Sequence, residues 1–360
     1  MMGHEFHFRD KIPVAILGAT GMVGQRFVEL LGNHPWFQIV CLAASEKSAG
    51  KTYAEAANWL MASPLPTSIA SMTLQSCQNL EPNRSFSLVF SSLDAACAGE
   101  IEADFVKNGY TVVTNARNHR MNQQVPLLIP EVNSAHLKLL DNQNLFGGNG
   151  KIVTNPNCST IGLCLALKPL QDHFGLESVH ATTMQAISGA GYPGVASLDI
   201  LDNVIPHIMG EEAKMETEPL KILGELVANQ IVSNPMKISA QCNRVAVSDG
   251  HMINVSVKLK QKPTKQEMIE AFQSFTSIAQ ELALPLAPKN PIHYFSEDQY
   301  PQPKVHRHLD KGMAVSIGRL RECPLFDYKF TLLSHNTIRG AAGGAVLNAE
   351  LMVRLGYIRW

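Results

Sequence analysis

The feature that most constrains the fold is a glycine-bounded turn between a predicted strand and a predicted helix near the N-terminus. Residues 12–17, IPVAIL, form a short β-branched apolar run, and residues 21–32, GMVGQRFVELLG, follow with helical spacing. Between them GATGMVG sets Gly18, Gly21 and Gly24 three residues apart. Glycines here let backbone amides approach a pyrophosphate, which the positive end of a helix also attracts. The spacing is GxxGxxG and not GxGxxG, so a tight turn without a ligand stays open as the alternative.

The order of the next apolar runs predicts an α/β fold. Strand-like runs at 37–44, 87–93 and 110–116 alternate with helical stretches, which is typical of a doubly wound parallel sheet of Rossmann type. After about residue 150 the runs at 178–188 and 251–260 alternate in polarity and predict an antiparallel or mixed sheet, with helices at 159–172 and 265–283. We therefore expect a nucleotide-binding domain at 1–152, completed by a C-terminal helix at 335–360, and an α+β catalytic and dimerisation domain at 153–334.

Composition excludes several classes of function. The formal net charge is -1 and no block of like charge occurs, which disfavours nucleic acid or a membrane surface as a partner. The first residues lack the apolar core of a signal peptide, and no run is apolar enough to span a membrane. The 7 cysteines show no CxxC pair and no metal-type spacing, so we expect a reducing, cytoplasmic location, no disulfide framework and no metal site.

The end of the second predicted strand bears on the choice of cofactor. An NAD site usually has an acidic residue there to bind the ribose 2′-hydroxyl. Here the strand is followed by Ser45, Lys47 and Ser48, whose hydroxyls and cation suit a 2′-phosphate. Glu46 opposes this interpretation unless it points to solvent. The sequence favours NADP.

Cys158 is the candidate nucleophile. It follows the turn Asn155-Pro156-Asn157 and begins an apolar helical run, where the helix dipole favours a thiolate that ionises near neutral pH. The local pattern fits a buried structural cysteine equally well, and that is the interpretation we favour for Cys41, Cys97, Cys164 and Cys242. His251, at the start of a strand, is a candidate base among 13 histidines, and Arg244 could bind a carboxylate.

Taken together, the motifs resemble those of aspartate-semialdehyde dehydrogenases of the archaeal and fungal branch. The matching segments are GATGMVGQRF, NPNCSTIG, SGAGYPGV, NVIPHIMGEEAKMETEPLKILG, CNRVAVSDGH and RGAAGGAVLNAEL, spread from about residue 12 to residue 358. The resemblance implies NADPH-dependent reductive dephosphorylation of L-aspartyl 4-phosphate to L-aspartate 4-semialdehyde through a cysteine thioester, in lysine, threonine and methionine biosynthesis. It also implies a homodimer or homotetramer acting on a small molecule.

The same resemblance implies roles for individual residues. Cys158 resembles the acylated nucleophile, His251 the acid/base and Gln185 the residue that orients the acyl intermediate. The implied substrate contacts are Arg244 for the carboxylate, Glu211 (or Glu212) for the amino group, Lys214 and Arg120 for phosphate, and Asn157. The expected cofactor contacts are Gly18, Thr20, Gly21, Met22, Val23, Gly24, Ser45, Lys47, Ser48, Ser91, Ser188, Gly189 and Asn336.

Two departures and three rival functions stay open at this stage. Arg117 stands where a small residue is expected, and Met252 follows His251 in an unusual context; either could alter the phosphate pocket or the cleft mouth. The rivals are an N-acetyl-glutamyl-phosphate reductase, a malonyl-CoA reductase and a catalytically silent dinucleotide-binding relative. An amino-group partner such as Glu211 has no task in the two reductases, and a silent relative has no chemical need for the full set of polar residues.

Overall fold

The N-terminal half forms a parallel sheet of Rossmann type. The computed structural model describes residues 11–358 except 79 and 81–84, so the first ten residues and the last two of the predicted domains lie outside it. The sheet has six strands in the order β3-β2-β1-β4-β5-β6, all parallel. Their bounds are β1 Ile12–Leu17, β2 Phe37–Ala44, β3 Gln75–Ser76, β4 Leu88–Ser91, β5 Thr111–Thr114 and β6 Lys151–Thr154. The predicted doubly wound sheet is confirmed.

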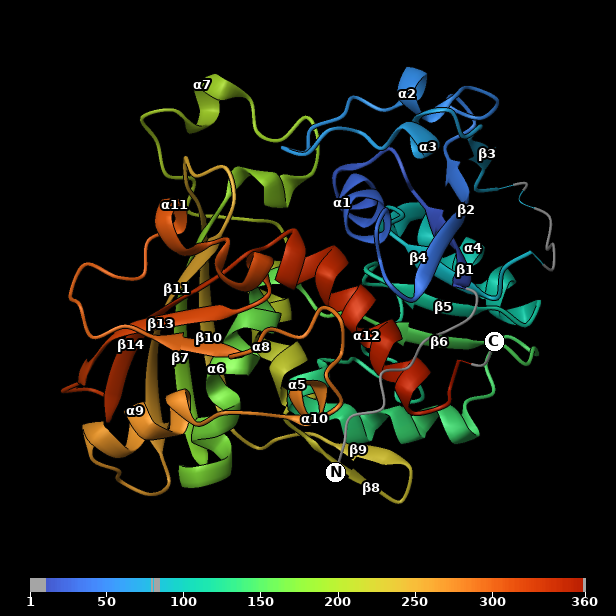
Figure 1. Ribbon diagram of the computed structural model, residues 1–360. Coiled ribbons are helices and arrows are strands. Elements are labelled where there is room, and N and C mark those ends of the chain that lie inside the picture. Colours follow the sequence, from blue (N-terminus) through green and yellow to red (C-terminus); the bar gives the residue numbers. More distant parts are fainter. Residues whose placement is uncertain (1–10, 79, 81–84, 359–360) are drawn as a thin grey trace.

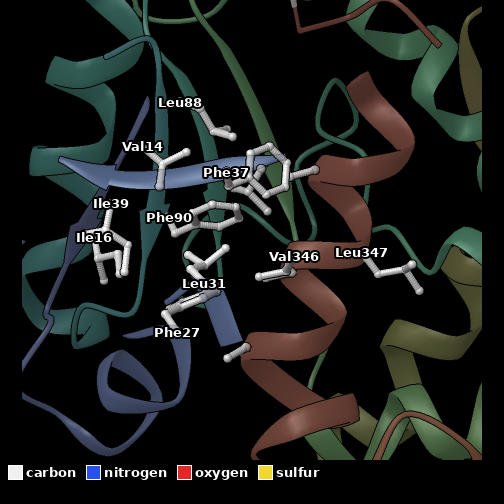
Figure 2. Packing of buried hydrophobic residues seen from close by; sticks show 14 of the residues in the cluster. Val14, Ile16, Phe27, Leu31, Phe37, Ile39, Leu88, Phe90, Val346 and Leu347 are labelled. Atoms are coloured by element: carbon white, nitrogen blue, oxygen red, sulfur yellow. The ribbon is translucent and has the colours of Figure 1, made fainter. Parts of the chain in front are cut away.

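Helices cover both faces of this sheet, which explains its continuous apolar runs. Val14 and Ile16 of β1 lie in a cluster with Phe27 of α1 (Met22–Leu31) and Val346 of α12 (Gly343–Arg354). Figure 2 shows this packing, with α12 beside the sheet although it comes last in the chain. The intervening residues of β1 face a second cluster that contains Phe105 of α4 (Ala95–Lys107). The C-terminal helix therefore returns to the first sheet, as predicted.

The second half contains a mixed sheet. Its six strands run in the order β10-β7-β11-β14-β13-β12, with parallel pairs at both ends and antiparallel pairs between them. The bounds are β7 Leu176–Gln185, β10 Lys237–Arg244, β11 His251–Leu259, β12 Ile292–Tyr294, β13 Val315–Glu322 and β14 Tyr328–Ser334. The helices α6 (Cys158–Phe174), α8 (Glu211–Ile222) and α9 (Lys265–Gln273) share one apolar cluster with this sheet. Figure 1 shows the two sheets on opposite sides of the molecule, with α12 between them.

The predicted helix at 265–283 is wrong as a single element. α9 ends at Gln273, and a separate short helix, α10 (Ile278–Glu281), begins after Ser277. The Ser274 hydroxyl donates to the Glu270 carbonyl at 2.6 Å, and the Ser277 side chain caps α10 by accepting from the Ala279 amide. Serine side chains compete in this way with helical backbone hydrogen bonds, so the helix stops and restarts.

The remaining elements are short. They are α2 Tyr53–Ala56, α3 Thr67–Ala70, α5 Pro130–Asn133, η1 Ser134–Asn142, η2 Ile187–Ala190, α7 Ser197–Ile200, β8 Glu225–Val227, β9 Gln230–Val232, α11 Pro303–His306, η3 Leu309–Gly312 and the π-helical turn η4 Ile338–Ala342. In the ranges that the structure describes, every helix is too short or too polar to cross a membrane.

Candidate active site

The start of α6 positions Cys158. Asn157 caps the helix, its side-chain oxygen accepting from the Ser159 and Thr160 amides at 3.0 and 3.3 Å. Cys158 is the first helical residue and is partly accessible, whereas Cys164, further along α6, is fully buried in the second sheet's core. The Asn157 cap fixes the start of α6, and it therefore holds the Cys158 side chain in a defined position at the positive end of the helix dipole.

His251 lies beside the sulfur. Its Nε2 is 3.3 Å from Cys158 Sγ, across a sequence separation of 93 residues. Its Nδ1 accepts a hydrogen bond from the Ala186 amide at 3.0 Å. A backbone N–H can only donate, so Nδ1 carries no proton and the neutral ring presents Nε2–H to the sulfur. Burial, then Arg244 and His335, lower the pKa of His251 to about 3, which keeps the ring neutral.

The expected ionisation of Cys158 near neutral pH is not favoured in this arrangement. Burial, followed by the nearby carboxylate of Glu211, raises the pKa of the Cys158 thiol to about 12. Arg120, Lys214 and Arg244 lower it by less than burial raises it. The helix dipole argument therefore underestimates desolvation, because a thiolate at this position loses most of its contact with water. Without substrate the structure favours a neutral thiol beside a neutral imidazole.

Glu211 is the centre of a hydrogen-bonded group next to Cys158. Its carboxylate accepts from Lys214 Nζ at 2.6 Å, from Asn157 Nδ2 at 2.9 Å and from Gln185 Nε2 at 3.3 Å. Burial alone would raise the pKa of Glu211, but the charge and hydrogen bonds of these partners lower it, so the group is a carboxylate. Glu212 turns the other way and accepts from the Cys242 amide at 3.2 Å. Of the two alternatives, Glu211 is therefore the one that reaches the cavity.

The two implied phosphate-binding cations are both paired with carboxylates. Lys214 is bonded to Glu211, and Arg120 Nη1 donates to Glu218 Oε1 at 2.9 Å. Arg244 is buried behind the site, where its Nη1 donates to the Ala186 carbonyl at 2.7 Å. That carbonyl belongs to the residue whose amide holds His251.

A cavity of about 340 Å³ connects these groups. Its lining includes Cys158, Gln185, Glu211, Lys214, Arg120, Asn157, Arg117, Ser188, Gly189, Asn336, Met22 and Val23. Asn336 Nδ2 donates to Ser188 Oγ at 2.8 Å and its Oδ1 accepts from the Gly250 amide, which ties the loop after β7 to β14. A Cβ on Gly189 would lie 2.8 Å from Arg244 Nη1 and 3.0–3.1 Å from the His251 ring, so a larger residue here would press on both side chains. Arg244 and His251 themselves lie just outside the lining.

A second cavity, of about 580 Å³, lies at the carboxyl ends of β1 and β2. Its lining includes Gly18, Thr20, Gly21, Ser45, Glu46 and Lys47, and it shares Leu93 with the first cavity. Gly18 has a φ of +74°, a left-handed value that favours glycine. Gly21 starts α1 without any side-chain cap or first-turn acid, and a Cβ there would meet only the Gly18 carbonyl, at 3.5 Å. Free helix amides facing open space fit a pyrophosphate.

Three predicted cofactor contacts lie outside both linings. Ser91 is fully buried at the end of β4, and Ser92 lines the second cavity in its place. Ser48 belongs to the turn after β2, where its amide donates to the Ser45 carbonyl. Gly24 serves packing: a Cβ there would lie 2.2 Å from the Gly18 carbonyl. Glu46 stays in the lining, and its carboxylate accepts from Ser76 Oγ at 2.9 Å.

Sequence reasoning missed two residues that the structure brings into this network. Glu218 is 2 % exposed and bonds both Arg120 and the Asn157 amide. Gly340 of η4 packs directly on Cys158, where a Cβ would approach the Cys158 Cβ to 2.8 Å. Among the residues that the structure describes, no group of three or more His, Cys, Asp or Glu side chains could hold a metal ion.

Comparisons with known proteins agree on one family. Residues 13–140 match the family model "Semialdehyde dehydrogenase, NAD binding domain" and residues 167–339 match "Semialdehyde dehydrogenase, dimerisation domain". Aspartate-semialdehyde dehydrogenases of Schizosaccharomyces pombe and Methanothermobacter thermautotrophicus are 46% and 45% identical to the chain, each over 95% of it and 98% and 99% of their own lengths. The crystal structure of the Candida albicans enzyme with NADP superposes with a TM-score of 0.89 at 41% identity, covering 97% of this chain and 100% of the other.

Proposed function

The chain belongs to the aspartate-semialdehyde dehydrogenase family, and on this premise we propose that it reduces L-aspartyl 4-phosphate to L-aspartate 4-semialdehyde with NADPH, releasing phosphate. The observation that carries the proposal is the contact of 3.3 Å between His251 Nε2 and the sulfur of Cys158, which lines a cavity together with Arg120 and Lys214. A nucleophile with an adjacent proton-transfer group and anion-binding cations is the arrangement that acyl-phosphate chemistry requires.

In the proposed first step the Cys158 sulfur attacks the acyl carbon, the carbon–oxygen bond to phosphate breaks, and the thiol proton leaves with the phosphate. Arg120 and Lys214 offset the charge of the departing phosphate. Glu211, a carboxylate with a lowered pKa, binds the substrate's amino group, and Arg244 binds its α-carboxylate. Gln185 and the amides at the start of α6 orient the acyl oxygen. The product of this step is a thioester on Cys158.

The thioester keeps an electrophilic carbonyl, which a carboxylate lacks. Bound NADPH supplies the hydride that reduces it. The carbon–sulfur bond of the resulting hemithioacetal anion then breaks as the aldehyde forms, and His251 Nε2–H stabilises the departing thiolate by a hydrogen bond until the sulfur takes up a proton from solvent. The hydrogen bond from the Ala186 amide to Nδ1 supports this role, because it fixes the tautomer that carries its proton toward Cys158.

The proposed cofactor contacts extend from Gly18 and Gly21 at the pyrophosphate to Ser188, Gly189 and Asn336 near the nicotinamide. The shared lining residue Leu93 supports one elongated site across both cavities. Ser45 and Lys47 support a preference for the 2′-phosphate of NADP, and the engagement of Glu46 with Ser76 limits its repulsion. The Candida albicans relative was crystallised with NADP.

The direct test follows NADP reduction with aspartate semialdehyde and inorganic phosphate, in the wild type and in Cys158→Ala. We expect phosphate-dependent reduction in the wild type and a loss of at least about a thousandfold in the variant, as for other covalent nucleophiles. An inactive wild type, or an alanine variant at full rate, would refute the function. A preference for NAD over NADP would refute the roles of Ser45 and Lys47 alone.

We also propose a homodimer or homotetramer in the cytoplasm, with domain boundaries at 152/153 and 334/335. The match of residues 167–339 to a dimerisation domain supports self-association. In that range Leu198, Leu201, Val204 and Met209 are 56–91% exposed, and a second copy of the chain would cover such residues. All 7 cysteines are unpaired, which suits a reducing compartment.

A further inference from the structure

One side of helix α8 carries a row of four charged side chains, the last two of which contact the loop that follows β5. The row consists of Glu211, Lys214, Glu218 and Lys221, which follow one another at helical spacing. Each of the four side chains makes at least one hydrogen bond. The first two line the cavity. Glu218 and Lys221 lie deeper, each 2 % exposed, and have no role in the chemistry described above.

Glu218 divides its two carboxylate oxygens between the nucleophile and the anion site. Oε2 accepts from the Asn157 amide at 2.7 Å, immediately before Cys158, and Oε1 accepts from Arg120 Nη1 at 2.9 Å. Both partners are otherwise held by different parts of the chain: Asn157 caps α6, and Arg120 Nη2 donates to the Asn115 carbonyl after β5. One buried carboxylate therefore joins the start of the nucleophile's helix to the guanidinium across the two halves of the molecule.

Lys221 fixes the same loop from the next turn of α8. Its Nζ donates to the carbonyls of Arg120, Asn122 and Val125 at 2.7, 2.7 and 2.8 Å. Burial lowers the pKa of Lys221 to about 8, and the charge of Glu218 opposes that shift. The backbone of Arg120 is thus held by Lys221, while its guanidinium is held by Glu218.

We propose that Glu218 is a positioning residue that sets the separation between the Cys158 sulfur and the anion-binding guanidinium of Arg120. The proposal rests on the proposed function, in which sulfur attack and phosphate departure occur on the same acyl carbon and need both groups in register. A misplacement of about 1 Å in such a pair can lower a rate by roughly a hundredfold. Glu218 acts through Arg120 and Asn157 and touches no reacting atom.

The test is a double-mutant cycle on the full-length enzyme with inorganic phosphate as the varied substrate. Glu218→Gln keeps the shape of the side chain but replaces one accepting oxygen with an NH2 group, which can only donate, so one of the two bonds is lost. We therefore expect kcat to fall and the KM for phosphate to rise, each roughly tenfold or more. In the Arg120→Ala background the same change should alter the KM for phosphate by less than about twofold, because the partner through which it acts is gone. Equal effects in both backgrounds would overturn the proposal.

Glu216→Gln is the matched control. Glu216 lies on the same helix and accepts from the Ala240 amide at 2.9 Å, away from both cavities, and its variant should retain the kinetic constants of the wild type. A Glu218→Gln variant that behaves like this control also overturns the proposal. If Glu218→Gln does not fold, Glu218→Asp, which keeps the charge but is one methylene shorter, enters the same cycle with the same deciding outcomes.

A second measurement separates this proposal from the proposed function. Inorganic phosphate bound at Arg120 should slow alkylation of Cys158 by iodoacetamide, and Glu218→Gln should raise the phosphate concentration needed for half-protection by roughly tenfold or more. This readout needs no turnover. A wild type without phosphate-dependent NADP reduction would refute the function, whereas unchanged protection in Glu218→Gln would refute only the role of Glu218.

Discussion

At the scale of single residues, the proposed chemistry depends on a thiol that the resting site favours in its protonated form. Burial and the Glu211 carboxylate raise the pKa of Cys158 to about 12, and burial lowers that of His251 to about 3. A substrate that binds Glu211 through its ammonium group offsets the carboxylate that disfavours the thiolate. The nucleophile would then become reactive when the substrate is present, which limits side reactions in its absence.

The pH dependence of alkylation tests this resting state. In the free enzyme the rate of inactivation by iodoacetamide should rise about tenfold per pH unit between pH 6 and 9 without a plateau, because the thiolate fraction of a thiol with a raised pKa grows throughout this range. Labelling of Cys158→Ala gives the background from the other cysteines. A plateau with a midpoint between pH 5 and 7 would show that a thiolate–imidazolium pair already exists in the free enzyme.

Arg117 supplies a further test at the mouth of the first cavity. Its side chain lines the cavity, is exposed and has no ion pair among the residues that the structure describes, whereas Lys214 and Arg120 are paired with carboxylates. We expect Arg117→Ala to raise the KM for phosphate about two- to fivefold, less so at high salt, and to leave kcat unchanged. Arg321→Ala, exposed and outside both cavities, is the control. A salt-independent effect, or a fall in kcat, would contradict a role in anion capture.

At the scale of elements, the π-helical turn η4 packs directly against Cys158. The Gly340 amide donates to the His335 carbonyl and the Ala342 amide to the Thr337 carbonyl, the five-residue spacing of a π turn. The wider turn brings the Gly340 backbone against Cys158 Cα, Cβ and O. Close packing of two helix backbones thus restricts where the start of α6 can move.

Gly340→Ala tests this contact. The added methyl group would lie 2.8 Å from Cys158 Cβ and 3.0 Å from its Cα, so η4 and α6 must separate. We expect a loss of about 1–3 kcal/mol in the free energy of unfolding, measured with denaturant, and at least a tenfold lower kcat. Gly99→Ala in α4 is the control, because its Cβ would meet only the movable Asn118 amide, and it should change stability by less than about 1 kcal/mol. An unaffected kcat in Gly340→Ala would show that α6 tolerates the shift.

The elements also show what the sequence can and cannot predict. Runs 12–17 and 37–44 predict β1 and β2 with the observed bounds, because buried parallel strands are continuously apolar. β3 was not predicted, since Gln75–Ser76 carries no apolar signal and pairs only with the end of β2. Ser91 and Ser92 show how accurately single contacts can be predicted. The cofactor contact was predicted at Ser91, which is buried, but Ser92 lines the second cavity. Successive side chains at the end of a strand point in opposite directions, so an error of one position selects a side chain on the wrong face.

Glu218 was missed for a different reason. The segment EEAKMETEPLKI alternates acids and bases, a pattern that is typical of a solvated helix face. Glu218 becomes buried only when the loop after β5 packs on α8. Its partner Arg120 is 98 positions away in the sequence, so the contact cannot be inferred from the local pattern. Cys158 and His251 could be inferred from the resemblance, but their separation and the tautomer of the ring come from the fold alone.

At the scale of the whole molecule, the last segment of the chain joins the two halves through two buried glutamates. Glu131 of α5 accepts two hydrogen bonds from Arg339 of η4, at 2.7 and 2.6 Å. Glu350 of α12 accepts from the Leu286 amide at 3.1 Å and lies 2.8 Å from His34 Nε2. Because His34 Nδ1 accepts from two backbone amides, its Nε2–H faces Glu350. Both glutamates are buried, but only Glu131 has a cationic partner.

The same substitution should therefore cost much more unfolding free energy at Glu131 than at Glu350. Burial raises the pKa of Glu350 well above its ordinary value, so the carboxyl is neutral in the fold and Glu350→Gln should cost less than about 1 kcal/mol of unfolding free energy. Glu131→Gln leaves the Arg339 guanidinium buried without a countercharge and should cost about 3–5 kcal/mol. Denaturant unfolding at neutral pH, with activity as a check on folding, measures both changes.

The pH dependence of the unfolding free energy, compared between the wild type and Glu350→Gln, tests whether the Glu350 carboxyl is neutral in the fold. Above about pH 4.5 the unfolded chain loses the Glu350 proton while the folded chain keeps it, so rising pH destabilises the wild type relative to Glu350→Gln, by at most about 1.4 kcal/mol per pH unit. The difference in unfolding free energy between the two proteins should therefore move in favour of the glutamine variant from pH 5 to pH 8. A difference that stays constant from pH 5 to pH 8 would contradict this prediction, because it would show that Glu350 is ionised in the fold as it is in the unfolded chain.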